Sequence, residues 1–198
     1  MELIGLTGTT GSGKGYVAAL FARYGIFCVD TDAIVHRLYR EERACIAQLA
    51  SEFGDILAKD GSVDRRKLAS IVFADRERLQ TLNRIVHVWV KDEVEKISQF
   101  HAQNGETYLL IDAPQLYEAG MDEICHRVIA VVAPMDLRIA RICARDALQR
   151  EAAMARIASQ HSDAFFKERA DYVICNDGIR SVEEQVDSIA GELGYGKT

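Results

Sequence analysis

A glycine-rich segment near the N-terminus, residues 8–15 (GTTGSGKG), has the composition of a loop that wraps around phosphate groups. Glycines let consecutive backbone N–H groups turn inward, and the start of a helix adds a partial positive charge. Lys14 would supply a full charge beside the outer phosphates of a nucleotide. The segment follows an apolar run and precedes a helical pattern, as this motif requires. We therefore expect a nucleotide-phosphate site formed by Gly11, Ser12, Gly13, Lys14, Gly15 and Tyr16.

The position after Lys14 departs from the usual form of this loop, which places a Ser or Thr hydroxyl there as a ligand of Mg²⁺. Gly15 and Tyr16 stand at these positions instead. We expect Mg²⁺ to be held through water and by carboxylates elsewhere, with Asp32 and Asp112 as the candidates.

Three aspartates follow predicted strands, at the edge of a parallel sheet where ligands bind. Asp30 and Asp32 are the two acids of the sequence VDTD (29–32), and Asp112 ends the apolar run YLLID. An acid at the position of Asp32 could accept a proton from a hydroxyl that attacks the γ-phosphate. The alternative for Asp30 or Asp32 is a helix N-cap. Two acids after one strand favour chemistry, and Asp32 is our candidate base.

Three arginines, Arg138, Arg141 and Arg145, recur at spacings of three and four residues and would share one face of a helix. For Arg141 and Arg145 we expect a lid that closes over ATP and places positive charge at the transferring phosphoryl group. For Arg138 we expect a solvated position on the helix surface.

The elements that would position these residues alternate along the chain. Apolar runs predict five buried parallel strands, at residues 3–7, 26–30, 108–112, 128–133 and 172–175. Helical patterns cover residues 14–24 and 182–193. Strands that alternate with helices indicate an α/β fold with a doubly wound, five-stranded parallel sheet. Residues 33–103 are too long for a simple crossover and predict an inserted helical lobe, and residues 135–169 predict the lid region.

Composition and charge indicate the number of domains, the class of partner and the location of the protein. The chain has 198 residues, of which 48% are hydrophobic, and this favours a single domain over residues 1–198. A net charge of −6 argues against nucleic acid as a partner. The five cysteines form no CxxC pair, and the sequence contains no signal-like segment or apolar run of membrane-spanning length. We therefore expect a soluble, cytoplasmic protein with reduced thiols and no membrane partner. The oligomeric state is left open.

Taken together, these segments resemble the dephospho-coenzyme A kinases, P-loop kinases of the fold class inferred above. The resemblance covers roughly residues 2–178. It is carried by TGTTGSGK (7–14), VDTDAIVH (29–36), the segment 53–73 with DGSVDRRKL, LNRIVH (82–87), IDAPQLYEAG (111–120), RICARD (141–146), ARIASQ (155–160) and ADYVICNDG (170–178).

The resemblance implies transfer of the γ-phosphoryl group of ATP, with Mg²⁺, to the 3′-hydroxyl of dephospho-coenzyme A. Lys14 resembles the lysine that holds the phosphates, Asp32 the catalytic base, and Arg141 and Arg145 the lid arginines. The remaining matches are Arg65, His87 and Glu118 for the acceptor and Asn176 and Gly178 for a loop near the adenine. The chain departs from the family pattern at Gly15, Tyr16, Val88, Gln115 and Phe166. At the position of Phe166 a basic residue is usual in the family, and Lys167 is adjacent.

Two other functions compete with this interpretation. The first is another P-loop small-molecule kinase, such as a nucleoside monophosphate kinase, against which the helical lobe argues. The second is a nucleotide-binding regulatory module with weak catalysis, suggested by Gly15. The presence of Asp32, Arg141 and Arg145 argues against that loss, because a protein that only binds nucleotide needs no base.

Overall fold

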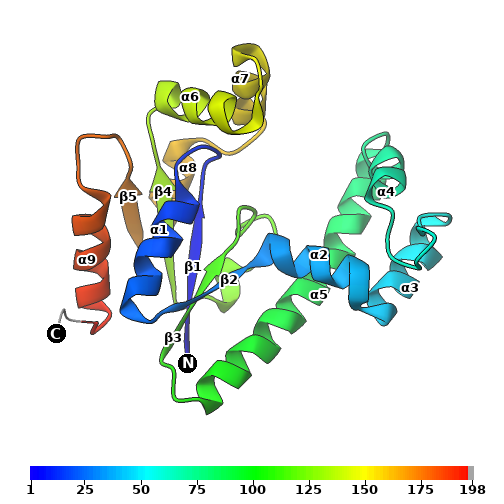
Figure 1. The fold of residues 1–198 in the computed structure, drawn as a ribbon, viewed down its shortest axis with the longest axis horizontal. Helices are drawn as coiled ribbons and strands as arrows, with labels where there is room; N and C mark the ends of the chain where they lie inside the picture. Colours follow the sequence, from blue (N-terminus) through cyan, green and yellow to red (C-terminus); the bar gives the residue numbers. More distant parts are fainter. Residues whose placement is uncertain (196–198) are drawn as a thin grey trace. The chain divides into compact units, whose positions relative to one another are not determined.

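The computed structural model describes residues 1–195 and divides the chain into two compact units (Figure 1). Met1–Val29 and the chain from His101 onward form the first unit, and Asp30–Phe100 form the second. The predicted α/β class is confirmed.

The first unit is built on a five-stranded parallel sheet with the order β2-β3-β1-β4-β5. The strands are β1 (Glu2–Gly8), β2 (Phe27–Asp30), β3 (Tyr108–Asp112), β4 (Arg127–Val132) and β5 (Tyr172–Cys175). Each lies within one residue of its predicted range at either end. Strand β1 is central, so that Leu6 lies opposite Asp112 of β3 and Gly8 lies opposite Val131 of β4.

One face of this sheet is covered by α1 (Lys14–Phe21) and α9 (Val182–Glu192) (Figure 1). The apolar side chains of these helices are buried, completely or nearly so, against β1, β4 and β5. This packing explains why the strand sequences are apolar and do not alternate with polar residues. The short helices η1 (Ala22–Tyr24) and η2 (Asp122–Ile124) lead into β2 and β4. The core therefore fixes the end of β1 and the start of α1, between which the glycine-rich loop runs.

Three helices follow β4 before the chain returns to the sheet as β5: α6 (Met135–Asp146), α7 (Arg150–Ala158) and α8 (Asp163–Arg169). Ile139 and Ile142 of α6 pack with Ala153 and Ile157 of α7 in a small core of their own. Helix α6 ends at Ala147, whose positive φ of 53° is the sole such value at a non-glycine position within residues 1–195.

The second unit is helical and consists of α2 (Thr31–Glu41), α3 (Arg43–Phe53), α4 (Arg65–Val72) and most of α5 (Arg76–Gln103). Each of these helices buries apolar side chains, and the Trp89 indole N–H of α5 donates to Gln48 Oε1 of α3 at 2.8 Å.

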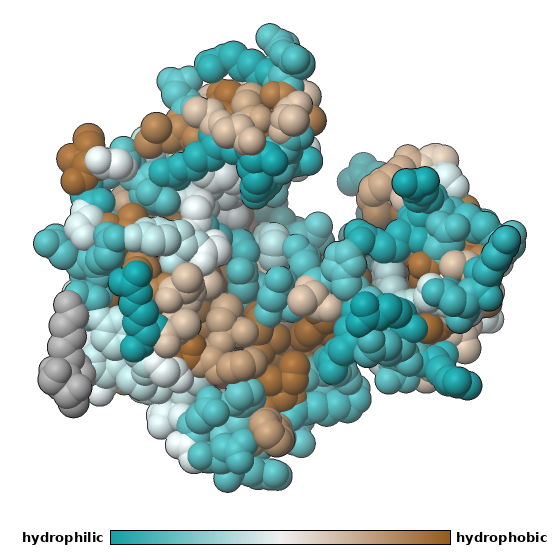
Figure 2. Space-filling view, viewed as in Figure 1, coloured by the Kyte–Doolittle hydropathy of each residue, from teal (hydrophilic) through white to brown (hydrophobic). Residues whose placement is uncertain are grey.

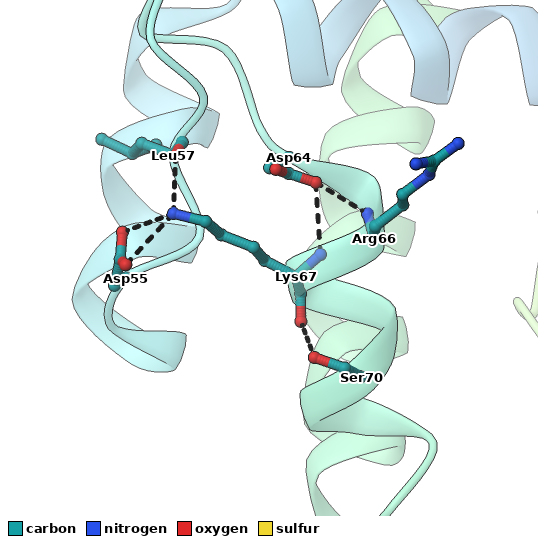
Figure 3. A network of polar contacts seen from close by, with 6 residues as sticks. All are labelled: Asp55, Leu57, Asp64, Arg66, Lys67 and Ser70. Atoms are coloured by element: carbon teal, nitrogen blue, oxygen red, sulfur yellow. Dashed lines mark hydrogen bonds and ion pairs between the residues drawn. The ribbon is translucent and has the colours of Figure 1, made fainter.

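A polar network fixes the start of α4 within the second unit (Figure 3). Lys67 Nζ donates to both carboxylate oxygens of Asp55, at 3.0 and 3.1 Å, and to the Leu57 carbonyl at 3.2 Å. Asp64 caps the helix by accepting from the backbone N–H groups of Arg66 and Lys67. Figure 3 shows the Arg66 guanidinium pointing away from this network. Lys67 is therefore committed to local structure, whereas Arg66 enters this network through its backbone N–H.

The surface drawn in Figure 2 carries hydrophilic side chains over most of its area, in keeping with a charged fraction of 27%. Within residues 1–195 we find no helix that combines the length and the apolar character needed to span a bilayer. All five cysteines are free thiols in the structure.

Candidate active site

The glycine-rich loop, which we define as residues 8–15, has a backbone that only glycine accommodates at three of its positions, Gly8, Gly11 and Gly13. Gly11 and Gly13 have positive φ values of 78° and 95°. A Cβ atom at Gly13 would lie 2.3 Å from Asn176 Nδ2, and one at Gly11 would lie 2.8 Å from the Arg138 carbonyl oxygen. Gly15 differs, because a Cβ atom there would have no described atom within 4 Å. The loop is thus closely packed on one side and open beside Gly15.

The carbonyl groups of the loop are held by side chains from outside it. The Thr10 carbonyl accepts from Arg138 Nε at 3.0 Å, and those of Gly11 and Ser12 accept from Arg141 Nη1 at 3.3 and 3.2 Å. Asn176 Nδ2 also donates to the Ser12 carbonyl, at 2.8 Å. Within a trans peptide the C=O and N–H groups point in opposite directions.

The following N–H groups, those of Gly11 and Gly13, therefore point away from these donors. The Ser12 N–H instead closes a turn onto the Thr9 carbonyl at 3.1 Å. The N–H groups of Lys14 and Gly15, the first two of α1, have no acceptor within their own helix because of their position, whereas that of Tyr16 donates to the Gly13 carbonyl. Together these groups form the start of an anion-binding nest.

Buried hydroxyl groups add to the polar character of this region. Thr9 and Ser12 are 2% and 1% exposed, and neither hydroxyl oxygen has a hydrogen-bond partner among the residues that the structure describes. A buried polar group without a partner is costly, so such groups usually find one in a ligand or in water. The hydroxyls therefore fit a site that receives phosphate oxygens or metal-bound water.

Lys14 and Asp112, both predicted to belong to the site, form an ion pair. Asp112 ends β3 beside β1, and Lys14, near the end of the loop, begins α1, so the parallel register brings the two side chains together. Both side chains are less than one-fifth exposed. The pair therefore places one ammonium group and one carboxylate that could bind a metal ion at the carboxyl end of the sheet. No cluster of three or more metal-ligating side chains occurs within residues 1–195.

The structure separates the two arginines that we expected to act together in the lid. Arg141 reaches the loop, where its Nη2 also donates to Asn176 Oδ1 at 3.0 Å. Arg145 instead donates to both carboxylate oxygens of its neighbour Asp146, at 2.7 and 2.9 Å, and its side chain is 62% exposed. Asp146 also accepts from Arg156 of α7. Hydrogen bonds from Arg145, with a smaller contribution from Arg156, lower the pKa of Asp146 to about 2.

Our expectation that Arg138 is solvated is wrong. Arg138 is 4% exposed, and its Nη1 donates to Asp163 Oδ1 at 3.1 Å while its Nε holds the loop. Burial lowers the pKa of its guanidinium. The three-residue spacing to Arg141 places both side chains toward the loop, and this spacing was the signal we read as a surface stripe. Asp163, which begins α8, was not among our candidates either.

Other predicted residues of the first unit lie at its loops. Glu118 Oε1, in the turn after β3, lies 3.5 Å from His161 Nε2, and the His161 ring stacks on Phe165 with centroids 3.7 Å apart. Gly178 has a φ of 80° in the turn after Asn176. The Tyr16 hydroxyl donates to Glu183 at the start of α9.

This bond from Tyr16 ties α1 to α9. The role of Tyr16 at the nucleotide stays a prediction. At the position where a basic residue is usual, Phe166 is 3% exposed and packs in the interior, whereas Lys167 is exposed.

The second unit carries the remaining predicted residues. Asp30 caps α2 by accepting from the N–H groups of Asp32 and Ala33, at 2.8 and 3.2 Å. Asp32 lies in the first turn of α2 and is exposed. Arg65 begins α4, where its Nη1 lies 3.1 Å from His36 Nδ1, and His87 lies half-buried on α5. The capping alternative thus applies to Asp30 and leaves Asp32 available.

Comparison with known proteins agrees with the family resemblance. The family model described as "Dephospho-CoA kinase" matches residues 2–181. The dephospho-CoA kinase of Bacillus licheniformis is 38% identical, over 94% of each chain, and that of Corynebacterium jeikeium is 36% identical, over 98% of this chain and all of its own. Among solved structures, TT1252 from Thermus thermophilus is 32% identical with a TM-score of 0.79, over 100% of this chain and 98% of its own.

Proposed function

The chain belongs to the dephospho-CoA kinase family, and we propose that it transfers the γ-phosphoryl group of ATP to the 3′-hydroxyl of dephospho-CoA, which gives CoA and ADP. The observation that carries this proposal is the glycine-rich loop, whose carbonyls are held outward by Arg138, Arg141 and Asn176. A loop ordered in this way before the nucleotide arrives presents N–H dipoles to phosphate oxygens without further reorganisation.

In this proposal the loop binds the phosphates of ATP through its inward N–H groups. Lys14, now paired with Asp112, turns its ammonium group to the β- and γ-phosphates, whose greater negative charge competes for it. Arg141 lies beside the loop with Asn176 and supplies positive charge near the transferring group. Arg145 has the smaller role, because Asp146 holds it in two hydrogen bonds.

The residues at the loop also fit Mg²⁺, which neutralises charge on the phosphate oxygens when it is bound. Asp112 supplies a carboxylate at the end of β3, and the buried hydroxyls of Thr9 and Ser12 suit bound water. The open space beside Gly15 leaves room for that water where other loops of this kind place a hydroxyl. We propose Asp112, acting through water, as the protein's contact to the metal, with Asp32 as a second.

For the acceptor, we propose that Asp32 takes the proton of the 3′-hydroxyl as its oxygen attacks the γ-phosphorus. The new O–P bond forms as the bond to the β-phosphate oxygen breaks, and ADP leaves with that electron pair. The support is that Asp32 is exposed in the first turn of α2 and that Asp30 performs the capping. We assign Arg65, His87 and the second unit to acceptor binding, together with Glu118 of the first unit.

An ADP-release assay with several acceptors tests the activity. We expect dephospho-CoA to give a kcat/KM far above that of AMP, CMP or shikimate. We also expect Lys14→Ala to remove nearly all turnover, because the loop loses its full positive charge, whereas Lys59→Ala at an exposed turn should act as wild type. Equal or better kcat/KM with a nucleoside monophosphate would overturn the assignment of substrate. ADP release that survives Lys14→Ala would overturn the assignment of the loop.

A further inference from the structure

The peptide groups on either side of Thr10 are held by two different parts of the chain, the segment that joins α7 to α8 and Arg138 of α6. The Thr10 N–H donates to Gln160 Oε1 at 2.8 Å, and the Thr10 carbonyl accepts from Arg138 Nε at 3.0 Å. Arg138 Nη1 in turn donates to Asp163 Oδ1. Two consecutive peptide planes of the glycine-rich loop are therefore oriented by residues 150 and 128 positions later in the chain.

The segment that supplies the Gln160 contact is itself well anchored. Ser162 caps α8 by accepting from the Phe165 N–H at 3.3 Å, and Ser159 Oγ donates to the Arg156 carbonyl at 2.8 Å. His161, between them, stacks on Phe165 and lies beside Glu118. Gln160 thus projects from a connection whose neighbouring residues all have contacts of their own, so that its amide has a defined position.

The Arg138 contacts are buried, whereas the Gln160 bond lies at the surface. Arg138 is 4% exposed, and a guanidinium removed from water needs hydrogen bonds to offset its desolvation. Its bonds to the Thr10 carbonyl and to Asp163 meet part of that need, and its buried Nη2 has no hydrogen-bond partner among the described residues. The loop and the start of α8 are thus held by one buried group. On the other side of Thr10, the Gln160 bond fixes the peptide whose carbonyl, that of Thr9, accepts from the Ser12 N–H.

We propose that Gln160 is a positioning residue for the nucleotide site, and that with Arg138 and Asp163 it fixes the Thr10 peptides so that the loop is ordered before ATP binds. The inference rests on the proposed function in one respect, namely that nucleotide phosphates bind at this loop. Gln160 touches neither the substrate nor the reacting atoms in this scheme. Its effect is to remove the entropic cost of ordering the loop during binding.

The test compares Gln160→Ala with two other variants. Each variant is studied first without nucleotide and then with ADP as the probe. Gln160→Glu keeps an acceptor oxygen for the Thr10 N–H. Gln149→Ala is the matched control, because Gln149 is exposed before α7 and its side chain makes no capping bond. The readouts are the hydrogen-exchange rate of the Thr10 amide, the Kd for ADP, and KM for ATP against kcat.

We expect Gln160→Ala to speed exchange at the Thr10 amide and to raise the Kd for ADP and the KM for ATP roughly two- to tenfold, the range for one neutral hydrogen bond. The KM for dephospho-CoA should stay within twofold of wild type. Gln160→Glu should keep slow exchange, and Gln149→Ala should match wild type throughout.

Three results would overturn the proposal: unchanged exchange in Gln160→Ala, faster exchange with an unchanged Kd for ADP, or equal weakening in Gln149→Ala. Failure of the proposed function would be seen separately, as wild-type protein that binds ADP without phosphorylating dephospho-CoA.

Discussion

Replacement of Gly13 by alanine tests the geometry of the glycine-rich loop most directly. Gly13 has a φ of 95°, a left-handed conformation that costs an L-residue about 1–2 kcal/mol. The new Cβ would also lie 2.3 Å from Asn176 Nδ2, so that the Asn176 side chain must move and lose its 2.8 Å hydrogen bond to the Ser12 carbonyl. That bond contributes about 1 kcal/mol. The two effects together lower the free energy of unfolding by about 2–3 kcal/mol.

A change of this size lowers the Tm by about 4–12 °C, since 1 kcal/mol corresponds to about 2–4 °C in a protein of 150–250 residues. Thermal unfolding followed by circular dichroism measures it. Gly15→Ala is the matched control, because its Cβ meets no described atom and alanine favours a helix over glycine. We expect its Tm to equal or exceed that of wild type. We expect the Kd for ADP to rise about tenfold or more in Gly13→Ala. A Gly13→Ala protein with wild-type Tm and Kd would refute the reasoning.

Four further predictions concern single groups. Asp32→Asn should keep ADP binding but lower kcat by about 10²-fold, the usual effect of a lost general base; a kcat within a few-fold of wild type would exclude it. Gly15→Ser should fold and should shift the dependence of activity on free Mg²⁺, and an unchanged titration curve would show that a hydroxyl there is irrelevant. Arg141→Ala should weaken ADP binding more than Arg145→Ala, which loses only contacts to Asp146, and equal calorimetric Kd values would contradict this. Burial raises the pKa of the Cys45 thiol from 9 to about 11, so the contribution of the neutral thiol to stability is complete below pH 9 and declines as pH rises toward 11. Between pH 9 and 11 the urea midpoint of Cys45→Ala should therefore fall less than that of wild type. An equally steep fall in the two proteins would contradict this.

The sheet was predictable because each strand is an uninterrupted apolar run bounded by turn residues. Residues 108–112 and 172–175 coincide with β3 and β5. The predicted helix at 14–24 ends earlier, at Phe21, and continues as a 3-10 turn to Tyr24 before Gly25, whose φ is 74°. The order of the strands was not specified by these local patterns, because it depends on which faces the connecting helices cover.

The site was predictable where backbone chemistry dictates the residue type. Gly13, Lys14 and Asp112 follow from what a phosphate loop and a neighbouring strand end require, and the structure brings the last two together. Gln160 lies within the segment ARIASQ (155–160), which resembles the family but did not predict a role for this residue. Nothing local to Gln160 indicates a bond to Thr10, because that contact depends on how α7 and α8 return the chain to the sheet.

The distance along the chain between the glycine-rich loop and its supports affects how the protein emerges from the ribosome. The Asn176 amide that holds the Ser12 carbonyl belongs to a residue 164 positions later. At ordinary rates of synthesis these two residues emerge roughly 10–30 s apart. At the start of that interval the loop already has its glycines and Lys14. The residues that orient its peptides are added later, first Arg138, then Gln160 and finally Asn176. The nascent chain therefore gains its ordered nucleotide site only after the second unit has been made.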